Sequence, residues 1–233
     1  MKTAFLSEFI TSKNVLMQSV VIYVVVSLVI GVSMQSPMAM VACIGAMTPF
    51  LMVFTFCALD GMNGWERFRA TLPVSRAAIV ASRYANVLFA SVFVLFLGWA
   101  VALALSAAVS VLPFDAGTVE AFASEASDPA MLLCAGVLGM GVTLFAASFI
   151  LPFAMRYGMT KAVRIVPVVL IMLLPASIFL LRQVPDMARL LSDISMWLDQ
   201  NVVLASAVFI AAVLAAYAAS CVVAVAMYRS KEL

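Results

Sequence analysis

The segment of this chain that gathers charges and aromatic rings is residues 60–84, DGMNGWERFRATLPVSRAAIVASRY. Guanidinium groups, carboxylates and aromatic rings suit recognition, and the segment contains no histidine or cysteine for nucleophilic or metal chemistry. It lies between two long uncharged apolar runs. We expect a cytoplasmic loop that docks a separate soluble protein. Its charged residues are Asp60, Glu66, Arg67, Arg69, Arg76 and Arg83.

A short helix near the membrane surface is expected in the first half of this segment. Gly61 and Gly64 break the end of the preceding apolar helix. Trp65, Phe68 and Leu72 then follow an i, i+3, i+7 pattern, which puts them on one face of a helix. The neighbouring charges fall off that face.

A second helix is expected after Pro73, which ends the first one because proline cannot continue a helix. Ser75 is placed to cap a helix that starts at Arg76 and runs into the next apolar stretch. The alternative interpretation of the whole segment is an ordinary basic loop with an interfacial tryptophan.

The rest of the sequence excludes several kinds of chemistry. The chain has no histidine, and no glycine precedes any lysine in the way that a phosphate-binding loop requires. The apolar runs hold essentially no ionisable residue away from their ends, which argues against ion-coupled transport and intramembrane proteolysis, although sodium sites built from carbonyl groups remain possible. We assign no catalytic, metal-ligating or substrate-binding residue. The four cysteines lack metal or redox spacing and fit small buried apolar residues: Cys43, Cys57, Cys134 and Cys221.

Composition places the chain in the membrane. It is 66% hydrophobic and 10% charged, whereas soluble domains carry about 25% charged residues. Its apolar runs reach the roughly 20 residues that cross a bilayer as a helix. The sequence predicts an all-α integral membrane protein that forms one transmembrane domain over residues 1–233. The six predicted spans are Val15–Val32, Met38–Leu59, Ala85–Leu112, Ala130–Met155, Ile165–Leu181 and Val202–Tyr228.

Basic residues decide the predicted orientation, because they concentrate in cytoplasmic loops. With both termini in the cytoplasm, only Arg182 and Arg189 lie outside. The cytoplasmic side then holds Lys2, Lys13, Arg67, Arg69, Arg76, Arg83, Arg156, Lys161, Arg164, Arg229 and Lys231. We expect a multi-pass protein of the plasma membrane.

Three further segments are predicted outside the spans. Residues 1–14 place Phe5, Leu6, Phe9 and Ile10 on one helical sector, which favours an interfacial helix on the inner leaflet, with a frayed terminus as the alternative. The outer segment 113–129 ends with Asp128-Pro129, a pattern typical of an N-cap followed by the first helical residue. The outer segment 182–200 has apolar residues at helical spacing and reads as an interfacial helix.

The stretch NGWERFRATLPVSRAAIVASRY resembles the loop between the second and third spans of small type-2 ATP-binding-cassette (ABC) permeases. In that loop an acidic and aromatic cluster precedes an LP-x-S/T-R element and a basic–aromatic pair. The six-span plan, with both ends inside and a short amphipathic first helix, is also similar.

This resemblance implies a permease that forms a homodimer or heterodimer in the bilayer, with a cytoplasmic ABC ATPase docked on each half. It assigns the coupling helix to Trp65, Glu66, Arg67, Phe68 and Arg69, and the turn back to the membrane to Leu72, Pro73, Ser75 and Arg76. ATP and magnesium would bind the ATPase, so we expect no cofactor on this chain and no enzymatic activity of its own. No nucleic acid is expected among its partners. The absence of a large outer domain argues against a polysaccharide or sterol substrate.

The leading hypothesis is the permease subunit of an ABC exporter that moves an amphipathic or apolar substrate, such as a peptide, bacteriocin or drug. Its direction follows from the resemblance alone. The alternative is a non-transport membrane partner, such as a sensor, immunity or assembly protein, that anchors a cytoplasmic protein through the same loop. A third possibility, a lipid-modifying enzyme, lacks a polar catalytic cluster.

Overall fold

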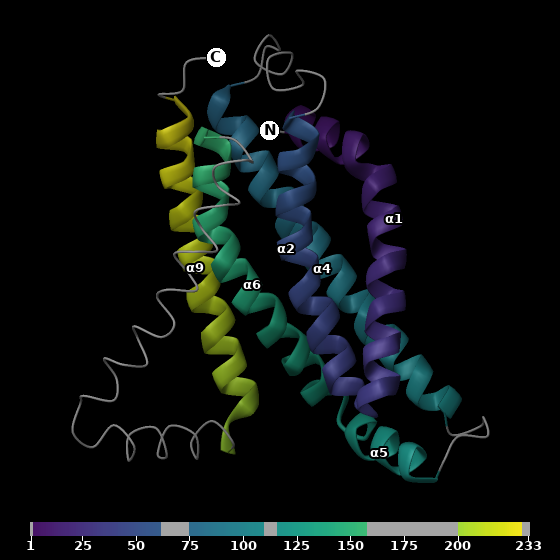
Figure 1. Cartoon of the computed structure of the whole chain (residues 1–233). Coiled ribbons are helices and arrows are strands. Elements are labelled where there is room, and N and C mark those ends of the chain that lie inside the picture. Colours follow the sequence, from purple (N-terminus) through teal and green to yellow (C-terminus); the bar gives the residue numbers. More distant parts are fainter. Residues whose placement is uncertain (1, 62–74, 110–115, 158–199, 230–233) are drawn as a thin grey trace.

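The computed structural model describes residues 2–61, 75–109, 116–157 and 200–229. Every regular element in these ranges is an α-helix: α1 (Lys2–Met34), α2 (Pro37–Gly61), α4 (Arg76–Val109), α5 (Ala116–Ala126), α6 (Pro129–Tyr157) and α9 (Val202–Arg229). Five of them are long and apolar enough to cross a membrane, and α5 is the short exception. They stand side by side as a bundle (Figure 1).

The first two helices form a hairpin with a tight turn. Gln35 ends α1 in the left-handed region, with φ 52°, and the amide of Ser36 donates to the carbonyl of Gly31 at 3.0 Å. Ser36 then caps α2, because its hydroxyl oxygen accepts from the amide of Ala39 at 3.1 Å. Pro37 takes the first helical position, where no amide proton is needed. Backbone groups at the end of α1 and at the start of α2 thus find hydrogen-bond partners within two residues.

The closest helix contact in the bundle core joins α2 to α6. The missing side chains of Gly45, Gly136 and Gly139 let the two backbones meet, since a Cβ on any of the three would collide with the opposite helix. Small residues permit this kind of close packing between membrane helices. Around this contact lie fully buried apolar side chains such as Met40, Ile44 and Leu144.

The opposite faces of the helices carry large exposed apolar side chains. Phe89, Phe93 and Phe96 on α4, and Phe145 and Phe149 on α6, are each between 45% and 53% exposed. A soluble protein rarely exposes so much apolar surface. These faces suit contact with lipid tails.

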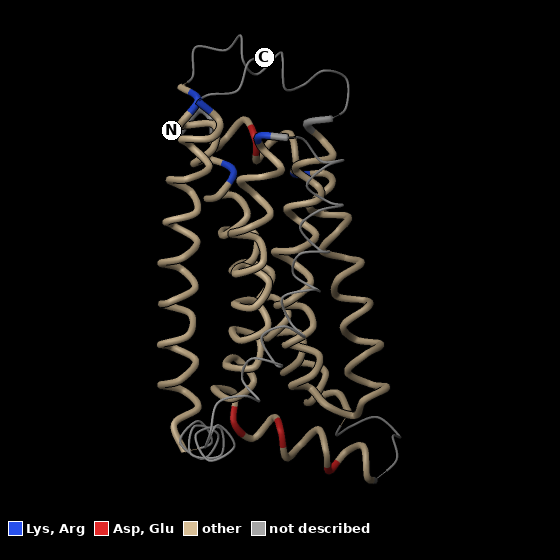
Figure 2. The backbone as a smooth tube through the Cα atoms, turned by 60° about the vertical axis from the view of Figure 1, so that its left-hand side comes forward, with Lys and Arg blue, Asp and Glu red and all other residues tan. Residues whose placement is uncertain are grey.

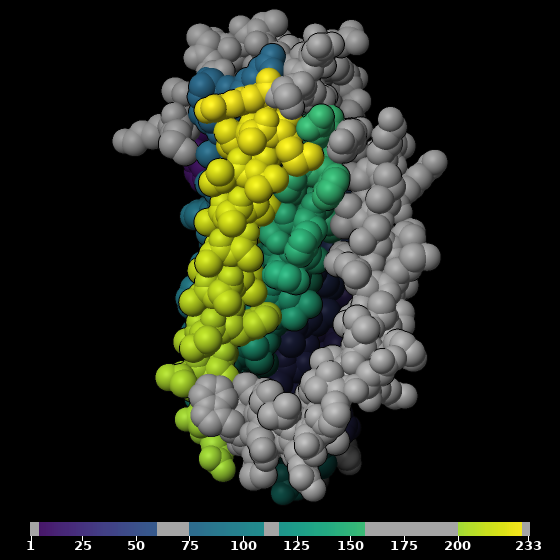
Figure 3. Space-filling model, turned by 90° about the vertical axis from the view of Figure 1, so that its left-hand side faces the viewer, coloured from purple at the N-terminus to yellow at the C-terminus, as the bar shows by residue number. Residues whose placement is uncertain are grey.

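Helices α6 and α9 run parallel to each other. The hydroxyl of Ser206 donates to the sulfur of Cys134 near the start of both helices, at 3.3 Å. Further along, the hydroxyl of Ser220 donates to the carbonyl of Ser148. Figure 3 shows the two helices side by side along one face of the molecule. The end of α6 and the beginning of α9 therefore lie at opposite ends of the bundle.

Basic residues of the described ranges gather at one end of the bundle, which also holds Glu8 and Asp60. Figure 2 shows the basic segments gathered at the end where α1 starts, and the acidic segments of α5 at the other. The six basic residues of the described ranges all belong to the first group: Lys2, Lys13, Arg76, Arg83, Arg156 and Arg229. This division has the sense expected from the sequence, while the side of the membrane that each end faces stays a prediction.

Helix α5 was not foreseen in the outer segment 113–129. It packs by Phe122, which is fully buried, and it reaches the α1–α2 turn. The carboxylate of Glu125 accepts from the hydroxyl of Ser36 at 2.8 Å and from the amide of Met38 at 2.9 Å. The side chain of Gln35 donates to Thr118 at 2.9 Å. A carboxylate at the start of α2 also suits the positive end of that helix dipole.

Two other boundaries predicted from the sequence can be compared with the structure. The N-cap at Asp128 is confirmed, since its carboxylate accepts from the amides of Ala130 and Met131 at 3.0 and 3.2 Å. Residues 1–14 do not form a helix separate from the first span, because α1 is continuous from Lys2; Figure 1 shows its first turns crossing the end of the bundle before the helix bends. The predicted span Ile165–Leu181 and the outer segment 182–200, except for its last residue, lie outside the described residues.

Candidate functional site

The predicted docking segment meets the described structure at its two ends. Helix α2 ends at Gly61 and α4 begins at Arg76. Seven of the nine predicted docking residues lie outside the described ranges: Trp65, Glu66, Arg67, Phe68, Arg69, Leu72 and Pro73. Ser75 and Arg76 are described, and both are exposed.

Ser75 caps α4 as the sequence predicts. Its hydroxyl oxygen accepts from the amide of Ala78 at 3.2 Å, and its carbonyl accepts from the amide of Ile79 at 3.1 Å. Such a cap satisfies one of the amides that the first helical turn leaves without a partner in the helix. The docking segment therefore returns to the bundle at a defined helix start.

Arg76 connects this start to the last helix. Its Nη1 atom donates to the backbone carbonyl of Arg229 at 3.0 Å, at the end of α9. The last carbonyls of a helix lack partners within the helix and carry partial negative charge, so a guanidinium there stabilises the helix end. Arg76 thus has a structural role beside its predicted part in docking.

About two turns further along α4 lies a buried ion pair. The Nη2 atom of Arg83 on α4 is 3.2 Å from Oε1 of Glu8 on α1, and their side chains are 2% and 7% exposed. Neutral donors surround the same carboxylate. The hydroxyl of Ser82 lies 3.0 Å from Oε2, and Nδ2 of Asn86 lies 3.4 Å from it. Their mutual attraction offsets part of the cost of taking a carboxylate and a guanidinium out of water.

The ion pair also contacts α2, because the guanidinium carbon of Arg83 lies 5.7 Å from the ring centre of Phe56. A cation over an aromatic face is attracted by the quadrupole of the ring. The cluster of Glu8, Ser82, Arg83 and Asn86 with Phe56, called the buried cluster below, therefore joins three helices. In the described part of the chain Oδ1 of Asn86 is buried without a hydrogen-bond partner.

The buried cluster corrects the sequence interpretation in two respects. Arg83 was grouped with the basic residues of the loop, but it lies inside the bundle, about 10 Å along α4 from its first residue. Glu8 was not singled out at all. It is the only acidic residue before Asp60, and a lone acid beside an apolar run needs a partner. The isolated position of Glu8 could thus have indicated a buried partner, but no neighbouring residue in the sequence identifies that partner.

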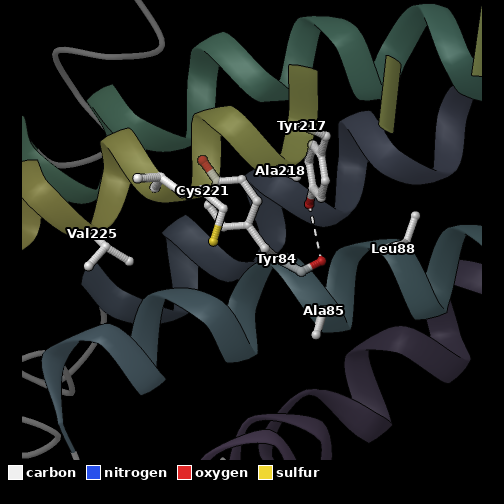
Figure 4. Close-up of a pocket in the computed structure, with 8 residues that line it drawn as sticks. Tyr84, Ala85, Leu88, Tyr217, Ala218, Cys221 and Val225 are labelled. Atoms are coloured by element: carbon white, nitrogen blue, oxygen red, sulfur yellow. Dashed lines mark hydrogen bonds between the residues drawn. The ribbon is translucent and has the colours of Figure 1, made fainter. Parts of the chain in front are cut away.

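A pocket of about 410 Å³ lies between α4 and α9, close to the buried cluster along α4 (Figure 4). Tyr84 and Tyr217 line it, but both of their hydroxyls already form hydrogen bonds within the protein. The hydroxyl of Tyr217 donates to the carbonyl of Tyr84 at 3.1 Å, and that of Tyr84 is 2.8 Å from the hydroxyl of Ser220. The remaining lining is small or apolar, with Leu88 and Val225 among it. The pocket suits an apolar group and offers nothing to a charged one.

Metal binding has no support in the described ranges, where no three histidine, cysteine or acidic side chains come together in a way that could hold an ion. The polar groups of this end instead form ties between helices. They can hold the start of α4 in a fixed relation to α1, α2 and α9.

Comparison with known proteins agrees with this architecture. A family model described as ABC-2 family transporter protein matches residues 5–229. Neither a curated protein nor a solved structure matches the chain. Because the family model covers nearly the whole chain, from the first turns of α1 to the end of α9, the chain belongs to the ABC-2 family of membrane transport proteins.

Proposed function

We propose that this chain is the membrane-spanning permease subunit of an ATP-driven exporter, and that a separate cytoplasmic ABC ATPase supplies the energy. The observation that carries this proposal is the family match over residues 5–229. The site adds a physical reason, because the segment between α2 and α4 joins the bundle at a capped helix start that is tied to α9. A movement of that segment would therefore act directly on α4 and, through Arg76, on α9.

The docking surface in this proposal is the predicted short helix with Trp65, Phe68 and Leu72 on one face. Buried aromatic residues often dominate interface energetics, at roughly 2 kcal/mol or more each. Glu66, Arg67 and Arg69 would surround them with charge that fixes orientation. Ser75 and Arg76 would position the segment from its far end.

The proposed cargo is an amphipathic or apolar molecule. From Asn14 to Leu59 the first two helices contain no charged residue, and the pocket between α4 and α9 presents no free polar group from its two tyrosines. A path of this kind suits a cargo that brings its own apolar surface. Export as the direction is inferred from the family resemblance of the loop.

The proposed topology keeps six spans with both termini in the cytoplasm, in the plasma membrane. Since α6 ends and α9 begins at opposite ends of the bundle, the chain between them has to return across it, and the predicted span Ile165–Leu181 supplies that crossing. The proposed assembly is a dimer of permease chains, either two copies or two related chains, with one ATPase on each.

Co-purification tests the docking proposal. The whole chain, tagged, is expressed with a cytoplasmic ABC ATPase from the same organism, either unchanged or as the Trp65→Ala/Phe68→Ala variant. We expect the double variant to insert normally and to lose most of the bound ATPase. Phe96→Ala serves as the control, since Phe96 is an exposed aromatic on the membrane face of α4 and its loss should leave binding unchanged.

Full ATPase recovery with the double variant would contradict the docking assignment. A partner that binds the loop but never hydrolyses ATP would favour the non-transport alternative of an anchoring protein. The two outcomes separate because binding and hydrolysis are measured on the same purified complex.

A further inference from the structure

We infer that Glu8 and Arg83 act as a latch that makes the first turns of α1 follow the two helices that flank the docking segment. The inference rests on the proposed function, since it concerns how a movement of that segment spreads. It assigns Glu8 and Arg83 as positioning residues for coupling, a role that neither helix packing nor the sequence suggests for them.

The placement of the buried cluster is the first reason. Phe56 lies on the last turns of α2, five residues before Gly61, and Arg83 lies eight residues after Ser75. Both helices that border the docking segment therefore meet at Arg83, which contacts Phe56 on one side and Glu8 on the other. A displacement of either helix end therefore reaches α1 through this guanidinium as well as through the packing contacts of α1 with α2 and α4.

The second reason is that α1 has other means of staying attached. Phe5 and Phe9 pack edge-on against Phe89 of α4, with ring centres 6.2 and 6.0 Å apart. These contacts are apolar and lack direction, whereas an ion pair fixes orientation as well as proximity. Replacing a buried ion pair by apolar residues of similar volume is often neutral or stabilising. Stability alone therefore does not require charge at this position.

The third reason is that the neutral donors of the buried cluster are also held by α4 itself. The hydroxyl of Ser82 lies 2.9 Å from the carbonyl of Ile79, and Nδ2 of Asn86 lies 3.0 Å from the carbonyl of Ser82. Both side chains are thus fixed by their own helix while they face the carboxylate of Glu8. The position of Glu8 is therefore set relative to α4, as a latch that keeps the two helices together requires.

The test compares two variants with opposite expected behaviour. Glu8→Met/Arg83→Met removes the charges but keeps apolar volume. Phe89→Ala removes the aromatic contact between α1 and α4 but keeps the ion pair. Both are purified with the ATPase and reconstituted in vesicles of phosphatidylethanolamine and phosphatidylglycerol. The thermal midpoint of the complex reports stability, and the rate of ATP hydrolysis reports coupling.

A second readout follows movement rather than rate. Spin labels on cysteines introduced at Leu6 and Ala85, both exposed, report the distance between the first turns of α1 and the first third of α4, with and without ATP trapped by vanadate. The four native cysteines are replaced in this background. Unchanged Glu8 and Arg83 should keep this distance constant, since the latch moves both sites together.

In the charge-free variant we expect a thermal midpoint close to that of the unchanged protein. ATP hydrolysis should fall about tenfold, within the usual range of coupling between sites, and the label distance should change when nucleotide is trapped. Phe89→Ala should lower the midpoint and leave the rate and the distance as they were. Arg83→Lys, which keeps the charge, should retain most of the activity.

Normal hydrolysis and a constant label distance in the charge-free variant would overturn the latch. A charge-free variant that does not fold would also count against it, because the charges would then be a structural requirement; Glu8→Gln, close in shape, repeats the rate comparison in that case. An unchanged complex that hydrolyses no ATP would instead contradict the proposed function itself, so the two failures are distinguishable.

Discussion

Arg76 and Arg229 meet although they are 153 positions apart, with Nη1 of Arg76 3.0 Å from the carbonyl oxygen of Arg229. The first residue of α4 thereby holds the last residue of α9. Since α4 follows the predicted docking segment directly, this bond ties the segment to the far end of the chain. Together with the buried cluster, it connects the start of α4 to three other helices.

The first prediction concerns this bond. Arg76→Gln should loosen the last turn of α9, because its final carbonyls lose a charged donor. The expected loss is about 1 kcal/mol, the usual size for one hydrogen bond. Amide hydrogen exchange of residues 225–229 should become faster in this variant and stay near its original rate in Arg76→Lys. Unchanged exchange in Arg76→Gln would show that α9 does not depend on this contact.

The second prediction concerns Glu125, whose carboxylate caps α2 from α5. Glu125→Ala should destabilise the α1–α2 turn by about 1–2 kcal/mol, since two partly buried donors lose their acceptor. Thermal or denaturant unfolding in detergent measures the change. Glu120→Ala is the matched control, because Glu120 lies on the same helix and is exposed. Equal effects of the two substitutions would contradict the capping role.

The third prediction concerns topology. A cysteine at Ala123, exposed on α5, should react with an impermeant thiol reagent in intact cells, because the acidic end is predicted to face outward. A cysteine at Ala70 should react only after the membrane is permeabilised. The native cysteines are replaced first; Cys57 and Cys134 are buried, and Cys43 and Cys221 are partly so. Labelling at position 70 but not at 123 would reverse the orientation.

Local signals in the sequence predicted local structure well. The cap at Ser75 and the Asp128-Pro129 start of α6 follow from side chains that reach amides two or three residues away, so neighbouring residues suffice to predict them. Five of the six predicted spans correspond to long apolar helices in the described ranges, since burial in lipid depends on composition and length. The family resemblance of the loop is confirmed by the match over residues 5–229.

Contacts between distant residues were beyond sequence reasoning. Glu8 and Arg83 are 75 positions apart, and no periodicity links an acid on α1 to a basic residue that reads as part of a loop. Helix α5 was missed because Phe122 is its one large buried apolar side chain and its other ties, from Thr118 and Glu125, reach the distant α1–α2 turn. Arg76 was assigned to docking, whereas its bond to α9 depends on how the helices assemble.

The central claim is that this chain uses ATP from a separate subunit to move an amphipathic cargo, and one measurement tests it directly. The chain and the ABC ATPase that co-purifies with it are reconstituted into inverted vesicles with an external fluorescent lysine–leucine amphipathic peptide. The account predicts peptide accumulation inside the vesicles that needs ATP and is lost in the Trp65→Ala/Phe68→Ala variant. Accumulation that is equal with and without ATP, or that persists in that variant, would contradict it.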